Sequence, residues 1–296
     1  MSLKSKIKRI PKLYQLLLNI LNSVGYFDKR FRYYFPKYKI TEIWRKRTEL
    51  VKLSPDNQKI EIAENAGKVF HDYQLMHNGL KITLGSYYDY GNTVLLQENK
   101  GVHEPQEEFA FQEVLKIILD GGSMLELGSF WSFYSMWFAS RIKDAKCIMV
   151  EPDPHKLNFG KLNFKLNNLQ GAFELGFIDQ ESNLSKPIPN YSVDDIFEKH
   201  KIKFLDILHS DIQGYELKML KGSERALSQK KIGFVFISTH SNELHDQCKQ
   251  ALESYGYTIL CSANLDESYS WDGLLVAQAG NYLYPLKIKI SYRDDA

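Results

Sequence analysis

An alternation of short apolar runs with helical patterns between residues 123 and 277 limits this chain to few folds. The runs expected to form strands are 124–127, 146–150, 172–178, 204–208, 232–237, 257–261 and 274–277. Strands that alternate with helices build a parallel, doubly wound sheet, and the last two runs are expected to close it as an antiparallel hairpin. Ligands bind such a sheet at the carboxyl ends of its strands. The expected fold class is therefore α/β and Rossmann-like.

The first of these strands leads into a tight turn. The stretch from Ser123 to Ser135 predicts a strand, a turn at Gly128 and a helix from about Trp131. A residue without a Cβ atom lets a ligand approach the backbone, and the helix points its free N–H groups at the same place. The turn lacks the three-glycine pattern of a dinucleotide site and the Gly-Lys-Ser/Thr of a phosphate-binding loop. NAD and ATP are therefore not favoured as ligands.

Glu151 is the last residue of the second expected strand. A carboxylate at this strand tip can accept hydrogen bonds from both hydroxyls of an unphosphorylated ribose. Together with Glu126 and Gly128 in the turn, this placement indicates S-adenosyl-L-methionine (SAM) as the ligand. The alternative is that Glu151 only caps the helix expected to begin near His155.

The residues before about 100 are interpreted as an accessory region. Strands are expected at 70–76, 80–84 and 93–97. The first two form a hairpin, because Asn78 and Gly79 between them readily adopt the φ > 0 positions of a tight turn. The acids at 107 and 108 suit the first turn of a helix. We therefore expect a helical and β-hairpin extension at 1–100 and a catalytic domain at 101–296.

The first segment carries an excess of positive charge. Through Lys52 the chain has 14 Lys and Arg against 3 Asp and Glu, and the remainder has 24 against 33. Apolar residues from Leu13 to Leu21 recur at helical spacing behind a collar of basic residues. We expect this amphipathic helix to pack on the main domain, with peripheral attachment to an anionic membrane as the alternative. Because no nucleic-acid-binding module is recognisable, we expect no nucleic-acid partner.

The cysteines and the apolar runs bear on where the protein resides. The three cysteines lie far apart without a Cys-x-x-Cys pair, which suits a reducing compartment. The apolar run near the N-terminus is interrupted at Asn19 and Asn22, well short of the ~20 apolar residues that a membrane span needs. We expect a cytoplasmic protein without a signal peptide or spanning helix.

Several motifs together point to a known family. They are His103-Glu104-Pro105-Gln106-Glu107-Glu108, Leu125-Glu126-Leu127-Gly128-Ser129, Val150-Glu151-Pro152-Asp153, Asn163 with Asn167, and Asp211-Ile212-Gln213-Gly214-Tyr215-Glu216-Leu217 followed by Leu220-Lys221-Gly222. Over residues 101–279 the chain resembles the FkbM family of SAM-dependent methyltransferases, and the last motif is the most specific. The resemblance implies a class I methyltransferase fold, SAM as cofactor, and commonly a hydroxyl acceptor on a sugar or secondary metabolite.

The chain departs from the family pattern in two places. In the turn, the family usually has Asp, Ala, Asn and Gly where this chain has Glu126, Ser129, Phe130 and Ser132. In the later motif, it usually has Lys and Glu where this chain has His209 and Gln213. The second change removes a carboxylate and introduces an imidazole.

The residues expected to bind the cofactor come from the turn, the tip at Glu151 and neighbouring loops. They are Glu104, Glu126, Gly128, Ser129, Phe130, Trp131, Glu151, Pro152 and Asp179.

A group that takes a proton is expected near the transferred methyl group, because the protein must align a hydroxyl and remove its proton. We expect His240 as this base and Asp211 as the orienting group, with His209 and Glu104 as further candidates. The alternative is that positioning alone drives the transfer. Asp211 and His240 are too few ligands for a metal ion, so none is expected.

The expected function is O-methylation of a hydroxyl on a saccharide, glycoconjugate or secondary metabolite. A nitrogen or carboxylate acceptor stays open. So does a non-catalytic protein that keeps the fold and uses its basic N-terminal segment to recruit partners.

Overall fold

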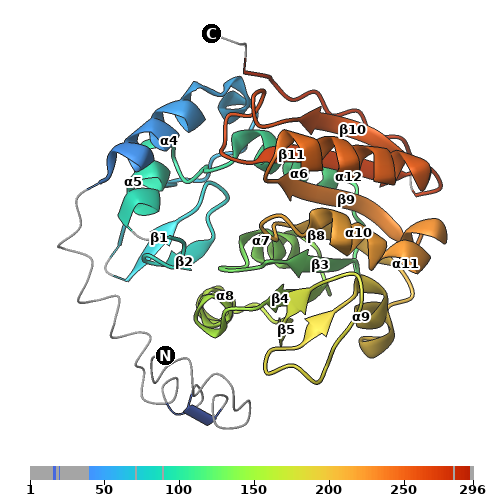
Figure 1. Ribbon diagram of the computed structural model, residues 1–296. Helices are drawn as coiled ribbons and strands as arrows, with labels where there is room; N and C mark the ends of the chain where they lie inside the picture. Colours follow the sequence, from blue (N-terminus) through green and yellow to red (C-terminus); the bar gives the residue numbers. More distant parts are fainter. Residues whose placement is uncertain are drawn as a thin grey trace.

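The computed structural model describes residues 40–70, 72–88, 90–282 and 284–293, together with residues 16, 17 and 20. Across this part of the chain the main sheet has seven strands in the order β10-β11-β9-β8-β3-β4-β5 (Figure 1). They are β3 (Ser123–Leu127), β4 (Lys146–Glu151), β5 (Ala172–Leu175), β8 (Leu205–Ser210), β9 (Ile232–Thr239), β10 (Tyr257–Ala263) and β11 (Gly273–Ala279). Neighbouring strands are parallel except that β11 is antiparallel to β9 and β10. The expected doubly wound sheet with a C-terminal antiparallel hairpin is confirmed.

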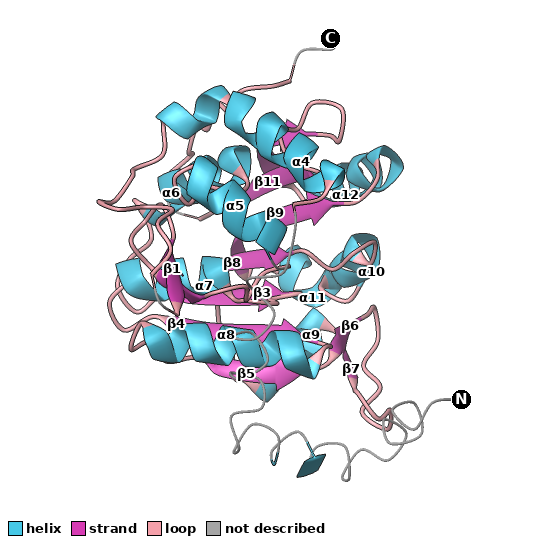
Figure 2. Ribbon diagram, turned by 90° about the vertical axis from the view of Figure 1, so that its left-hand side faces the viewer, coloured by secondary structure: helices cyan, strands magenta, loops and turns pink. Residues whose placement is uncertain are grey.

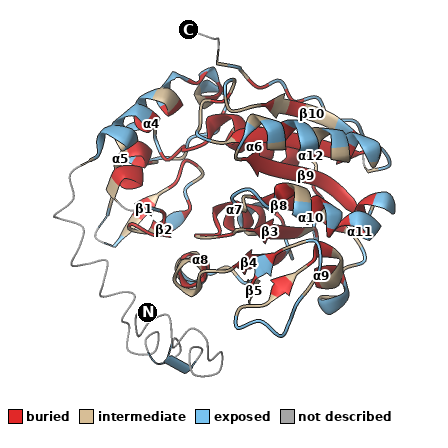
Figure 3. Cartoon of the chain, viewed as in Figure 1, coloured by how far each residue is buried: buried red, intermediate tan, exposed pale blue. Residues whose placement is uncertain are grey.

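Helices cover both faces of this sheet (Figure 1 and Figure 2). One face is covered by α6 (Pro105–Leu115), α7 (Phe133–Arg141) and α8 (Pro154–Leu166), and the other by α9 (Val193–Lys199), α10 (Glu216–Lys221), α11 (Glu224–Ser228) and α12 (Asn242–Ser254). Side chains alternate between the two faces along a strand, so Met124 packs in one hydrophobic cluster and Leu125 in the other. The two-sided burial explains why the core strands are mainly apolar (Figure 3).

The run expected as one strand at 172–178 is divided. Its first part is β5, and its last two residues form β6 (Phe177–Ile178), which pairs in parallel with β7 (Asn190–Tyr191). Gly176 separates the two parts and donates its backbone N–H to the carbonyl of Glu151. The chain therefore leaves the main sheet beside the tip of β4.

The accessory region shares its core with the first face of the sheet. It contains α4 (Glu42–Leu53), the short 3₁₀ helix η2 (Pro55–Gln58), the hairpin β1 (Tyr73–Leu75) and β2 (Lys81–Thr83), and α5 (Tyr90–Glu98). The hairpin is confirmed, but the strand expected at 93–97 is wrong because these residues lie in α5. A short Thr-Val-Leu-Leu run suits a strand or a helix equally well, and here packing decides, since Leu95 and Leu96 are fully buried in the same cluster as α6 and α7.

Asn163 of α8 and Asn167, the C-cap residue of this helix, fasten the hairpin to the sheet. The backbone N–H of Thr83 donates to Asn163 Oδ1 at 2.7 Å, and that of Lys81 donates to Asn167 Oδ1 at 2.9 Å. The Asn163 amide also donates to the carbonyl of Trp131 at 3.0 Å. One helix thus links the hairpin to the turn that follows β3.

The basic amphipathic helix expected between Leu13 and Leu21 lies almost entirely outside the described residues. Within the described ranges, no helix combines the length and the apolar character needed to cross a membrane.

Candidate active site

The turn after β3 joins the ends of three strands. Gly128 has φ 72°, and a Cβ atom built on it would lie 1.8 Å from the carbonyl oxygen of Asp211. Its backbone N–H and that of Ser129 both donate to the carbonyl of Val150 on β4. Only glycine fits this position, because both its φ and its contact with Asp211 exclude a side chain. The turn, the tip of β4 and the residue after β8 are therefore in direct contact.

The turn continues in an unusual backbone conformation. Phe130 and Ser132 have φ values of 40° and 59°, in the left-handed region that residues with side chains rarely adopt. The hydroxyls of Ser129 and Ser132 are buried and have no hydrogen-bond partner among the residues that the structure describes. Strained backbone and unpaired buried hydroxyls are typical of a site that completes its contacts with a ligand.

Glu151 lies at the tip of β4 and points back into the turn. Its Oε2 accepts the backbone N–H of Phe130 at 3.2 Å, and its Oε1 accepts that of Asp153 at 2.8 Å. Burial raises the pKa of its carboxyl against these hydrogen bonds. Asp153, not Glu151, caps α8, because its Oδ1 accepts the backbone N–H of His155 at 2.8 Å. The alternative that Glu151 serves only as a helix cap is therefore disfavoured.

Glu126 lies on β3, two residues before Gly128, and is buried. It is 3% exposed, its Oε2 accepts the backbone N–H of Ser135 at 3.1 Å, and burial raises its pKa to about 7. A buried carboxyl at the start of α7 is a suitable partner for the amino group of a bound amino acid.

The aromatic residues of the turn form a wall with the accessory region. The Trp131 ring stacks on Tyr87 at a centroid distance of 4.3 Å and an interplanar angle of 9°. Phe130 packs edge-on against Tyr88 at 5.5 Å, and Lys156 Nζ lies 4.3 Å from its centroid on the other side. The loop between β2 and α5 therefore closes one side of the turn.

The remaining cofactor candidates lie at either end of this edge. Pro152 follows Glu151 and is half-buried. Asp179 follows β6, and its Oδ2 accepts from the Asn190 amide at 2.9 Å. Glu104 is buried on the opposite side, where its carboxylate lies 3.4 Å from Arg47 and 3.2 Å from His103.

His209 lies in a sealed cluster. The residue is 3% exposed, its Nε2 lies 2.6 Å from Glu107 Oε1, and Glu107 Oε2 accepts from Ser238 at 3.0 Å. Burial lowers the pKa of His209, but the charge of Glu107 outweighs it and raises the pKa overall. The Tyr134 ring covers the imidazole at a centroid distance of 4.2 Å. His209 therefore does not fit the predicted catalytic role, since it is both paired and covered.

His240 lies in an open cluster after β9. Its Nδ1 is 2.8 Å from Glu216 Oε1, and its Nε2 is 3.2 Å from Asp211 Oδ1 and 3.3 Å from Asp272 Oδ1. The Gln213 amide nitrogen lies 2.7 Å from the same Nε2. Burial lowers the pKa of His240, but hydrogen bonds to Asp211 and Glu216 and the charge of Asp272 raise it to about 10. The imidazole is therefore protonated near neutral pH, which conflicts with the predicted role of a free base.

Sequence analysis missed the members of this site that come from distant segments. Asp272 directly precedes β11, and Arg47 lies in α4, far from the motifs in sequence. Arg47 Cζ lies 4.6 Å from the centroid of Trp271 and 5.3 Å from that of Trp44. The Trp44 and Arg47 spacing of i and i+3 was the one local signal, since it places both on one side of α4.

No group of three or more His, Cys, Asp or Glu side chains within the described ranges is arranged to hold a metal ion. The cluster around His240 instead combines one cation with its carboxylates, which is the arrangement of an ion-pair network.

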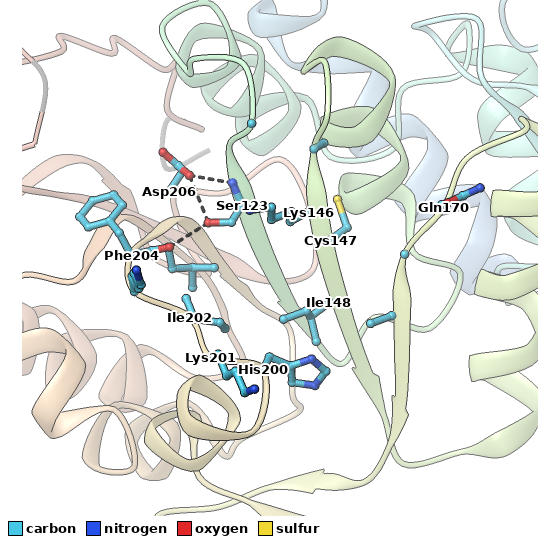
Figure 4. Close-up of a pocket in the computed structure, with 16 residues that line it drawn as sticks. Ser123, Lys146, Cys147, Ile148, Gln170, His200, Lys201, Ile202, Phe204 and Asp206 are labelled. Atoms are coloured by element: carbon cyan, nitrogen blue, oxygen red, sulfur yellow. Dashed lines mark hydrogen bonds between the residues drawn. The ribbon is translucent and has the colours of Figure 1, made fainter.

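A cavity of about 770 Å³ lies at the other end of the strands (Figure 4). It is lined by the amino ends of β3, β4 and β8, with Lys146 and His200 among the lining residues. Its carboxylate, Asp206, is already used, because Oδ2 accepts from the backbone and hydroxyl of Ser123 at 2.7 and 3.2 Å. Ligands of doubly wound sheets bind at the opposite edge, so we do not place SAM in this cavity.

Part of the chain is similar to a known methyltransferase domain. Residues 167–259 match a family model described as "Methyltransferase FkbM domain". The matched stretch covers less than half of the chain, and together with the Rossmann-like sheet order it supports a SAM-dependent methyltransferase. The matched stretch runs from the end of α8 into β10 and is the part of the chain that is similar to the FkbM domain. The turn at Gly128 and Glu151 precede it, so their roles depend on geometry.

Solved structures that resemble the chain are distant from it. Precorrin-6y C5,15-methyltransferase from Geobacter metallireducens GS-15 is 13% identical, with a TM-score of 0.41 over 58% of this chain and 87% of that one. TrmK from M. capricolum in complex with S-adenosyl-homocysteine is 16% identical, with a TM-score of 0.41 over 60% and 71%. A putative SAM-dependent methyltransferase from Streptococcus mutans is 14% identical, with a TM-score of 0.46 over 72% and 57%. No curated protein matches the chain in sequence.

Proposed function

We propose that this protein transfers the methyl group of SAM to a hydroxyl oxygen on a saccharide, glycoconjugate or related secondary metabolite. The proposal is supported by the contact between the turn at Gly128 and Asp211, from which we infer that the open cluster of Asp211 and His240 lies beside the cofactor. Both lie at the carboxyl ends of neighbouring parallel strands, where ligands of this fold bind.

The residues at this edge fit SAM. Glu151 would accept the ribose hydroxyls, and Pro152 and Asp179 line the edge beyond it. Glu126 and the turn from Gly128 to Trp131 would hold the methionine end, for which the unpaired hydroxyl of Ser129 is available. When bound, SAM supplies an electrophilic methyl group on a positively charged sulfur.

The protein's own task is to align the acceptor hydroxyl and receive its proton. Because His240 is already protonated near neutral pH, it acts as the cation that holds the surrounding carboxylates in place. Asp211 keeps its role as orienting group, since its carboxylate contacts both His240 and the amide of Gln213. Glu104 fixes Arg47 behind this cluster.

The test has two parts. SAM should raise the melting temperature of the protein, because it binds the folded state. Incubation with SAM and a panel of neutral sugars should then release S-adenosylhomocysteine together with a methylated product. Binding of SAM without turnover of any hydroxyl acceptor would favour the non-catalytic alternative, and turnover only with amines or carboxylates would favour another methyltransferase specificity.

A further inference from the structure

The loop between β10 and β11 reaches the candidate active site through strand register. β11 is antiparallel to β9 and pairs Gly273 with Thr239, so the preceding residue, Asp272, falls opposite His240. A Cβ atom on Gly273 would lie 2.5 Å from Thr239 Oγ1, so the absence of a side chain there permits the close approach. The 3.3 Å contact between Asp272 and His240 follows from this pairing.

Asp272 and Asp211 share one imidazole nitrogen. Each carboxylate has an oxygen within 3.3 Å of His240 Nε2, and their side chains are 22% and 27% exposed. A single N–H cannot fully satisfy both carboxylates, so one of them is free to accept a proton from elsewhere. Glu216, the third carboxylate on this imidazole, is fully buried and lies on Nδ1.

The surroundings of Asp272 raise the pKa of its carboxyl group. Burial raises the pKa of Asp272, and the charges of Asp211 and Glu104 raise it further, while His240 and Arg47 lower it; the result is about 7. A carboxyl that titrates near neutral pH is an effective proton acceptor there. Two acids with different environments are a common way to divide the roles of base and orienting group.

Exposed aromatic rings border these carboxylates. Trp271 is 42% exposed, its ring lies 5.6 Å from that of Trp44, and Arg47 is held against both indoles. Tyr88, 46% exposed, extends the surface toward the turn through Phe130. Aromatic rings next to carboxylates suit an acceptor that has an apolar face and hydroxyls at its rim, as the ring of a sugar does.

The charge of the site restricts the acceptor further. Its carboxyl groups are Glu104, Glu108, Asp211, Glu216 and Asp272, and its cations are Arg47, His103 and His240. Carboxyl groups outnumber cations, so the site favours the positively charged SAM and disfavours an acceptor that carries its own carboxylate.

We propose that Asp272 is the proton acceptor of the reaction and that Trp271 is the surface on which a neutral or amino-bearing sugar ring packs. This inference rests on the proposed function. In the step, the acceptor oxygen forms a bond to the methyl carbon as the bond from sulfur to that carbon breaks. The hydroxyl proton passes to the Asp272 carboxylate, and the sulfonium becomes a neutral thioether.

The experiment measures single-turnover methyl transfer from saturating SAM to methyl glycosides of neutral hexoses, amino sugars and uronic acids. Asp272→Asn is compared with Asp272→Glu and with Asp266→Asn, a matched control on the same loop whose exposed carboxylate accepts a hydrogen bond from the Asn242 amide. Trp271→Ala tests the packing surface, and SAM affinity is measured by calorimetry for every variant.

Loss of a general base lowers the rate by about 10² to 10⁴. We expect a loss of this size in Asp272→Asn with unchanged SAM affinity, partial recovery in Asp272→Glu, and a rate near wild type in Asp266→Asn. The acidic limb of the pH–rate profile should disappear in Asp272→Asn, and Trp271→Ala should raise KM more than it lowers kcat.

An active wild-type enzyme whose Asp272→Asn variant stays within severalfold of Asp266→Asn would overturn the inference and leave the proposed function standing. A preference for uronic acids would overturn the restriction on acceptor charge. If the wild-type protein binds SAM but methylates none of these hydroxyl compounds, the proposed function fails and this inference fails with it.

Discussion

Strand β8 carries an aspartate at each end, and the two carboxylates have opposite surroundings. Asp206, near the amino end, accepts hydrogen bonds from Ser123 with one oxygen (Figure 4). Its other oxygen accepts from the hydroxyl of Tyr282. Asp211, just past the carboxyl end, shares a histidine with Asp272 and touches the glycine turn. The wide cavity is at the first end, yet its carboxylate is used for structure. The second end has the strained turn and the incompletely satisfied acids, which indicate function better than a large volume does.

The two histidines near the carboxyl end show the same contrast on a smaller scale. His209 is paired with Glu107 inside the core, whereas His240 is half-buried among carboxylates that reach solvent. Both residues lie near the carboxyl ends of neighbouring strands, β8 and β9, but exposure and partners separate a structural histidine from a functional one.

The largest effect on stability is expected from breaking the buried ion pair between His209 and Glu107, called here the sealed pair. Glu107→Ala leaves His209 and Ser238 without their acceptor in the core, and removal of one partner of a buried ion pair costs about 3 to 5 kcal/mol. Urea unfolding measures the loss. Glu113→Ala on the same helix, which removes a partner of the exposed Lys116, is the control and should cost less than about 1 kcal/mol. Equal losses in both variants would contradict the structural role of the sealed pair.

The two aspartates of β8 should separate in function. Asp211→Asn weakens the orienting contact of an ionised group, worth about 1.5 to 3 kcal/mol, so the transfer rate should fall roughly ten- to more than hundredfold with little change in stability. Asp206→Asn should lower the free energy of unfolding and leave the transfer rate of the folded enzyme near wild type. If both variants lose stability and neither loses transfer rate, the assignment of a functional role to Asp211 and a structural role to Asp206 is wrong.

Glu151→Ala tests the cofactor side of the carboxyl edge. Loss of hydrogen bonds to an ionised acceptor should weaken SAM binding by about 1.5 to 3 kcal/mol, roughly ten- to more than hundredfold. Calorimetry with SAM measures the change, and circular dichroism confirms the fold. Unchanged affinity in a folded variant would remove Glu151 from the site.

The smallest effect, counted per pH unit, is expected from the pH dependence of the free energy of unfolding. Burial lowers the pKa of His103, but Glu104 and Glu108 outweigh it and raise the pKa from 6.5 to about 10. The folded protein therefore binds more protons than the unfolded chain between these values. The stabilisation by His103 is complete below pH 6.5 and is lost as pH rises toward 10, by no more than about 1.4 kcal/mol per pH unit.

Urea unfolding between pH 6 and pH 10 measures this slope, and His103→Gln should reduce it, with the remaining slope coming in part from His240, whose pKa is also raised to about 10. A slope that is unchanged in the variant would show that other groups control the alkaline stability.

Local patterns were enough to predict much of the sheet and its cofactor edge. The position of Glu151 at a strand tip and of Gly128 in the turn follows from apolar runs that end at those residues, and the hairpin at Asn78 follows from turn chemistry. The run at 93–97 could not be assigned, because the same residues suit a strand or a helix until their packing partners are known.

The composition of the cluster around His240 could not be predicted from local patterns. Its carboxylates come from positions 211, 216 and 272, and Asp272 reaches it only through the antiparallel register of β11 with β9. The protonation of His240 depends on all three carboxylates together. The sequence therefore predicted a base at a position where the structure has a cation. Arg47 likewise reaches the site from α4, which precedes the rest of the site in sequence.

The most direct test of the central claim is the structure of the complex with S-adenosylhomocysteine. We expect the ribose hydroxyls within hydrogen-bond distance of Glu151 and the sulfur facing Asp211 and Asp272. S-adenosylhomocysteine bound instead in the cavity beside Lys146 and Asp206, or a sulfur that faces away from the open cluster, would contradict the assignment of function to the carboxyl edge of the sheet.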